Sequence, residues 1–162
     1  MIELPPFHPL AVHFPVALLP ASVASDVLGR FTGRPSLAHA GWWTLLFATI
    51  ASPVAAASGW IWLSDMDGMT GTTITIHQWL GTVMPILLIA LTAWRYRAHV
   101  RETPVSTAYL AAATVVLMAM VVQGHLGATM TFGGSSHDHE PATVPADDGW
   151  RDSIQLKEHH HE

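Results

Sequence analysis

The stretch PVSTAYLAAATVVLMAMVVQGHL, residues Pro104–Leu126, decides the fold class of this chain. It contains no charged side chain, and it is longer than the about 20 helical residues that cross the roughly 30 Å hydrocarbon core of a bilayer. Three further apolar runs precede it, at about residues 9–29, 37–63 and 74–94, and the segments between them have the composition of turns. The sequence therefore predicts an all-α membrane protein, with a four-helix transmembrane bundle over residues 1–132.

The composition of the whole chain supports this class and excludes several functions. Of the 162 residues, 50% are hydrophobic and 12% are charged, whereas soluble domains carry about 25% charged residues. The chain has a net charge of −5 and no run of basic residues, so it lacks the clustered positive charge by which proteins bind nucleic acid. Because there is no cysteine, thiolate zinc sites, iron–sulfur clusters and covalently attached haem are excluded.

The basic residues predict the orientation of the bundle. Most of them lie in the first and third connections: Arg30, Arg34, Arg95, Arg97 and Arg101. Because positive residues favour the cytoplasmic side, both termini are predicted outside, in the periplasm if the membrane is a bacterial inner membrane. Asp26 precedes Arg30 by about one helical turn, so we expect these two side chains to pair at the cytoplasmic surface.

The last part of the chain, residues 133–162, is a polar tail rich in His and Asp. Its first residues, Gly133-Gly-Ser-Ser136, are typical of a flexible linker, and His137 and His139 follow directly. The sequence therefore predicts that the tail is not part of the bundle.

Four histidines are predicted at one face of the membrane, although three different runs carry them. His8 and His13 begin the first run, His77 begins the third, and His125 ends the fourth. Pro9 favours the first helical turn, so we expect His8 in the chain that enters the helix. Ionisable side chains at membrane depth are costly, which makes them the first candidates for function.

Neutral imidazole is a strong axial ligand of haem iron. Two facing helices of a four-helix bundle can hold haem b by bis-histidine ligation without any cysteine. The sequence therefore predicts an electron carrier rather than an enzyme, with haem b near the outer face. Its partner is a periplasmic redox protein or a quinone. The candidate axial ligands are two of His8, His13, His77 and His125.

Two alternatives remain open. Imidazole is also the commonest ligand of copper and zinc, so the same four histidines, with His137 and His139, indicate a copper- or zinc-binding membrane protein. In the other alternative, the protein is a structural subunit of a larger membrane complex, surrounded by membrane lipid. The histidines then only bond carbonyl groups that prolines leave free.

Three short motifs contain these histidines: HPLAVHFP at His8–Pro15, HQWLG at His77–Gly81 and GHLG at Gly124–Gly127. Over about residues 5–134 the chain resembles a family of uncharacterised bacterial four-helix membrane proteins, catalogued as a domain of unknown function, that opens with an HPLxVHFP signature. The resemblance implies a cytochrome b-like placement of histidines. Some relatives are joined to c-type cytochrome domains, which implies outward-facing electron transfer.

The chain departs from the pattern of this family after its third motif. Members of the family tend to continue with a further histidine and a Gly-Val pair, whereas this chain reads TMTFGGSS over Thr129–Ser136. The role of that further histidine falls to His137 or is missing here.

Overall fold

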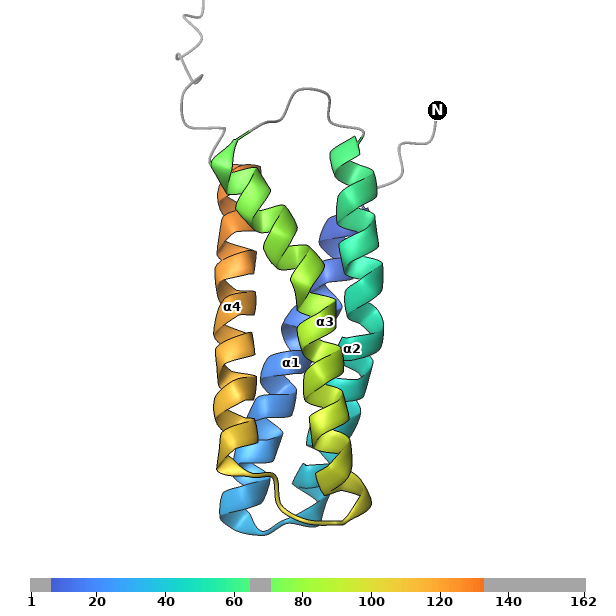
Figure 1. The fold of residues 1–162 in the computed structure, drawn as a ribbon, viewed down its shortest axis with the longest axis vertical. Helices are drawn as coiled ribbons and strands as arrows, with labels where there is room; N and C mark the ends of the chain where they lie inside the picture. The colour runs from blue at the N-terminus through green and yellow to red at the C-terminus, as the bar shows by residue number, and fades with distance from the viewer. Residues whose placement is uncertain (1–6, 65–70, 133–162) are drawn as a thin grey trace, which may run out of the picture.

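The computed structural model describes residues 7–64 and 71–132, which form a bundle of four helices without a strand in these two ranges (Figure 1). The helices are α1 Phe7–Thr32, α2 Pro35–Ser64, α3 Thr72–Val100 and α4 Thr107–Phe132. Each of the four is long and apolar enough to cross a membrane. The predicted all-α membrane bundle is therefore confirmed. The tail, with His137 and His139, lies outside the described residues.

The helices begin and end at different residues from the predicted apolar runs. α3 continues to Val100, six residues past the predicted boundary at residue 94. The arginines that end the apolar run do not end the helix. α4 begins at Thr107 instead of residue 104, since the Ser106 hydroxyl caps it by accepting a bond from the Tyr109 backbone N–H at 3.1 Å. α1 already includes His8, so the prediction that this residue precedes the helix was wrong.

Each helix packs against two neighbours, so that α1 and α3 lie diagonally across the bundle. We name the end where α1 and α3 begin the histidine end, because it carries His8 and His77, and the opposite end the arginine end, because it carries Arg30 and Arg95. Figure 1 shows α3 beside α2 at the arginine end and leaning toward α4 at the histidine end. The two ends are therefore packed differently.

Buried residues recur every three or four positions along each helix, as knobs-into-holes packing of a left-handed bundle requires. In α3 the buried residues are Met84, Leu88, Leu91 and Arg95, and in α4 they include Tyr109, Ala113, Val116 and Met120. The outward faces are apolar as well, with many large side chains more than half exposed. Such a surface is stable only in contact with lipid or a partner.

Hydroxyl groups make some of the hydrogen bonds between the helices. The Thr49 and Thr92 hydroxyls lie 2.7 Å apart between α2 and α3, and the Trp60 indole N–H donates to the Thr82 hydroxyl at 3.1 Å. Pro53 leaves the Thr49 carbonyl without its helical donor, and the Ser52 hydroxyl donates to that carbonyl at 3.0 Å. The proline bend is thus compensated inside the bundle, as a lipid environment demands.

The turn after α3 is held by two backbone bonds of a Schellman motif. The Glu102 N–H donates to the His99 carbonyl at 3.2 Å, and the Thr103 N–H donates to the Ala98 carbonyl at 3.0 Å. Glu102 has a φ of 52°, in the left-handed region that glycine adopts without strain. After α1, Gly33 occupies the same region with a φ of 66°.

We predict that Glu102→Gly raises the free energy of unfolding by about 0.5–1 kcal/mol, because it removes the left-handed strain of a side chain and a negative charge at a helix C-terminus. Unfolding of the detergent-solubilised protein by increasing SDS, followed by circular dichroism, measures the change. Gly33→Ala is the matched control and should lower stability by about 1 kcal/mol, since nothing within 4 Å obstructs its Cβ and only the backbone is strained. Equal effects of the two substitutions would contradict the argument.

Candidate functional site

The structure divides the four predicted histidines into two pairs. His8 and His77 are partly buried and lie on the diagonal helices α1 and α3. His13 and His125 are exposed on the outside of the bundle, and His13 Nδ1 bonds to the Pro9 carbonyl of its own helix. Of the four, only His8 and His77 are therefore partly buried in the bundle, each against a neighbouring helix.

The partner of His8 determines which of its ring nitrogens carries the proton. His8 Nδ1 lies 3.0 Å from Ser58 Oγ on α2. The Ser58 hydroxyl already donates its one hydrogen to the Ala55 carbonyl at 2.8 Å, so Nδ1–H donates and Ser58 Oγ accepts. In the neutral ring, Nε2 then keeps its lone pair and is available to a ligand.

His77 reaches the same state through a different partner. Its Nδ1 lies 3.2 Å from the Gln123 backbone carbonyl on α4, and a carbonyl can only accept, so Nδ1 carries the proton. The Gln123 side-chain amide donates to the His77 carbonyl at 2.9 Å and lies 3.4 Å from His77 Nε2. The second distance is beyond the usual range of a hydrogen bond, so the contact between the Gln123 amide and His77 Nε2 is weak.

Gln123 is incompletely bonded, although it is a polar side chain at membrane depth. Its Oε1 is buried and has no hydrogen-bond partner in the part of the chain that the structure describes. Since a buried amide normally satisfies both of its polar atoms, Oε1 of Gln123 is an acceptor that remains open to a further partner.

Glycines face the two inward histidines and make room for their rings. A Cβ on Gly59 would lie 2.9 Å from His8 Cε1, and a Cβ on Gly127 would lie 3.1 Å from His77 Cε1. His8 also contacts Trp62, with 5.5 Å between the ring centroids. Small residues on α2 and α4 therefore allow the imidazoles to enter the bundle.

Packing is looser around these histidines than elsewhere. Among the side chains that the structure describes, none of α3 before Met84 and none of α4 after Met120 is buried. At the same end, α1 and α2 still have buried residues, Ala11 and Ser58 among them. The α3–α4 pair thus encloses the histidine end less tightly than the α1–α2 pair does.

The arrangement presents two unprotonated imidazole nitrogens from diagonal helices, each fixed through its other nitrogen. Second-shell bonds of this kind orient histidines that bind iron or other metals. No group of three or more His, Asp or Glu residues that could hold a metal ion by itself is present in residues 7–64 and 71–132. Two imidazole nitrogens are a donor set for a centre that takes two histidine ligands.

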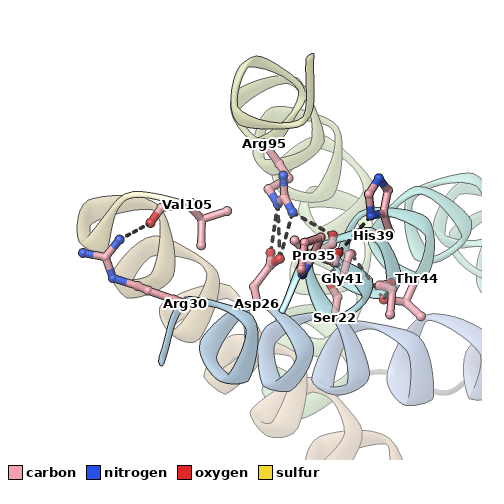
Figure 2. A network of polar contacts seen from close by, with 11 residues as sticks. Ser22, Asp26, Arg30, Pro35, His39, Gly41, Thr44, Arg95 and Val105 are labelled. Carbon is pink, nitrogen blue, oxygen red and sulfur yellow. Dashed lines mark hydrogen bonds and ion pairs between the residues drawn. The ribbon is translucent and has the colours of Figure 1, made fainter. Parts of the chain in front are cut away.

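The arginine end contains a buried ion pair that joins the same two diagonal helices (Figure 2). Arg95 Nη2 lies 3.0 Å from Asp26 Oδ1 and Arg95 Nε lies 3.1 Å from Asp26 Oδ2, while both residues are only 2% exposed. Arg95 Nη2 also donates to the Ala38 carbonyl of α2 at 2.9 Å. The pair therefore connects three helices.

The predicted pairing of Asp26 with Arg30 was wrong. The Arg30 guanidinium donates to the Val105 carbonyl at 2.6 Å and to the Thr107 hydroxyl at 3.2 Å, at the start of α4. Asp26 instead faces the interior, where burial favours a partner on another helix over a neighbour in the sequence that can reach water. Arg30 and Arg95 thus hold this end together by separate contacts.

The family model described as "Predicted membrane protein (DUF2231)" matches residues 4–139. The chain belongs to this DUF2231 family. Among curated proteins and among solved structures, no match was found. The predicted family resemblance is confirmed, and its description indicates a membrane location without naming an activity.

In this DUF2231 protein, sequence reasoning missed the partners that orient the candidate ligands. Ser58 and Gln123 were not selected, because a single serine or glutamine in an apolar helix has no distinctive spacing. Gln123 nevertheless had a usable signal: it is the one amide in an otherwise apolar span, two residues before His125. For Arg95, the signal was a charged residue directly after the third run, close to the membrane level of Asp26 near the end of the first run.

Proposed function

We propose that this protein is a membrane cytochrome b-like electron-transfer protein, with haem b held between His8 and His77 near the outer, periplasmic face. One observation carries the proposal. His8 and His77 enter the bundle from diagonal helices, and the contacts of their Nδ1 atoms with Ser58 Oγ and the Gln123 carbonyl favour the tautomer in which Nε2 of each ring keeps its lone pair. An axial ligand of haem iron needs that state.

The residues present fit this group in two further respects. The side chains of α3 and α4 are less buried at the histidine end than at the arginine end, which favours entry of a planar group there. The Gln123 amide lies 3.4 Å from His77 Nε2, so a ligand at this nitrogen would replace only a long contact.

Bound haem would supply a reversible one-electron change that no side chain of this bundle supplies. The protein would fix the two imidazoles, exclude water with apolar helices and place the centre near one membrane surface. That position suits exchange of electrons with a periplasmic redox protein or a quinone.

We predict that the wild-type protein, expressed with added haem and purified in detergent, has a Soret band that shifts on reduction. His8→Ala and His77→Ala should each lower the haem content per protein at least about tenfold, because one axial ligand is lost. Absorption spectra of the oxidised and reduced proteins give both results. Elemental analysis of the same samples separates iron from copper or zinc.

His13→Ala and His125→Ala are the matched controls, since both residues are exposed at the same end. They should keep the wild-type haem content. A wild-type protein without a Soret band, or equal loss in all four variants, would overturn the proposal. A subunit in which the histidines serve only packing would show no haem in any variant.

A further inference from the structure

A second candidate site lies at the arginine end, far from the histidines. A pocket of about 230 Å³ is lined by the last turns of α3, the turn that follows and the first turn of α4. It has room for roughly seven water molecules at about 30 Å³ each, and hence for a phosphate group with the atoms attached to it.

The charges around this pocket have one sign. Arg97, in the last turn of α3, and Arg101, the residue that caps this helix, line the pocket and are exposed. Neither guanidinium makes a hydrogen bond or an ion pair with any residue in the ranges that the structure describes. Arg95 also lines the pocket, but Asp26 neutralises it. The pocket therefore carries two positive charges without a bonded partner, and its lining includes no acid.

Hydroxyl groups complete the polar lining. Thr103 and Ser106 belong to the turn and supply these hydroxyls, whereas Tyr109, which lines the pocket from α4, is only 3% exposed and its hydroxyl bonds to Asp26. The Schellman bonds of the turn fix the backbone of Thr103, and Ser106 is fixed as the cap of α4. Guanidinium and hydroxyl donors on a rigid turn match the oxygens of a phosphate.

The neighbouring cavity does not share this character. It measures about 250 Å³ and is lined by Arg30, Arg34 and His39, but also by both acidic side chains of this region, Asp26 and Glu102. His39 and His99 lie there with 6.0 Å between their ring centroids, and Trp42 stacks on His99 at 4.5 Å. Since carboxylates repel an anion, the pocket of Arg97 and Arg101 is the better anion site.

One wall of the Arg97 and Arg101 pocket is aromatic and open to the outside of the bundle. Trp94 lines it, is 45% exposed and contacts Tyr109 edge to face at 6.1 Å. Tryptophan at this depth is typical of the level of lipid headgroups. We propose that this pocket binds the phosphate of an anionic phospholipid, with Arg97 and Arg101 on the phosphate oxygens and Trp94 against the glycerol and acyl chains. Basic pockets between transmembrane helices bind headgroups in this way.

The test uses the full chain in detergent, titrated with dioctanoyl phosphatidylglycerol, with dioctanoyl phosphatidylcholine and with inorganic phosphate, and analysed by native mass spectrometry. Phosphatidylglycerol should occupy one saturable site and bind more tightly than phosphatidylcholine. Arg97→Gln and Arg101→Gln should each weaken its binding about fivefold, and Arg101→Lys less. Because both side chains are exposed, the helical content measured by circular dichroism should stay unchanged.

Arg34→Gln is the matched control, because Arg34 is an exposed arginine of the same end that lines only the neighbouring cavity. It should leave phosphatidylglycerol binding within about twofold of wild type. Equal weakening by Arg34→Gln would show that the lipid responds to the overall positive charge of the arginine end instead of a specific site. Equal binding of phosphatidylcholine would show that the site does not select an anionic lipid. Inorganic phosphate that binds as tightly as phosphatidylglycerol would assign the pocket to a free anion. Each of these results overturns the proposal.

Discussion

Replacing Arg95 with leucine is expected to lower the free energy of unfolding by about 3–5 kcal/mol. The substitution leaves the Asp26 carboxylate buried without a cation, and it also removes the donor to the Ala38 carbonyl. Because both charged residues are only 2% exposed, water cannot replace the lost partner. Unfolding of the detergent-solubilised protein by SDS, followed by circular dichroism, measures the loss.

Two variants separate the ion pair from a general effect of arginine loss. Arg97→Leu removes an exposed arginine from the same helix and should change stability by less than about 0.5 kcal/mol. The double variant Asp26→Leu/Arg95→Leu should recover at least half of the loss, since apolar replacement of both charges leaves neither unpaired. A single-variant loss below about 1 kcal/mol would contradict the assignment of the pair as the main polar connection between α1 and α3.

Gly41→Ala is expected to lower the free energy of unfolding by about 1–3 kcal/mol, although alanine favours a helix more than glycine does. A Cβ at this position would lie 2.8 Å from Asp26 Cγ and would contact Asp26 Oδ1. Arg95 holds the carboxylate in place, so it cannot move without losing its bonds. The Ser22 hydroxyl, which donates to the Gly41 carbonyl at 2.7 Å, holds α1 and α2 at this short separation.

Gly124→Ala is the control for this second prediction. A Cβ on Gly124 would meet nothing within 4 Å, so the substitution should leave stability unchanged or raise it by up to about 1 kcal/mol. The same SDS unfolding experiment compares the two variants. Opposite signs for Gly41→Ala and Gly124→Ala support close contact at the ion pair, whereas equal losses would point to a general intolerance of added methyl groups.

The two ends of the bundle share one feature, which is that α1 and α3 both carry polar side chains into the interior. α1 and α3 lie diagonally, and these side chains are Asp26 and Arg95 at the arginine end and His8 and His77 at the histidine end. Asp26 and Arg95 form an ion pair with each other. The other two are satisfied by α2 and α4 through Ser58 and Gln123, so their Nε2 atoms are left for a ligand.

The sequence by itself determined the class of the protein and its four spans. Charge-free runs such as Pro104–Leu126 can only be buried in lipid or protein, and their lengths match a bilayer. The short histidine motifs also sufficed to indicate the family, which the match over residues 4–139 confirms. These properties depend on composition and local order along the chain, so no tertiary contact is needed to predict them.

Only the tertiary structure decided which polar residues meet. Helices α2 and α4 are apolar on all sides, and the hydrophobic pattern therefore does not reveal the face that points inward. Four histidines predicted at one membrane face became two that enter the bundle and two that point outward, and Asp26 paired with Arg95 instead of Arg30. The rotation of each helix about its own axis made this choice, and that rotation is set by packing against neighbouring helices and by the need of buried charges for a partner.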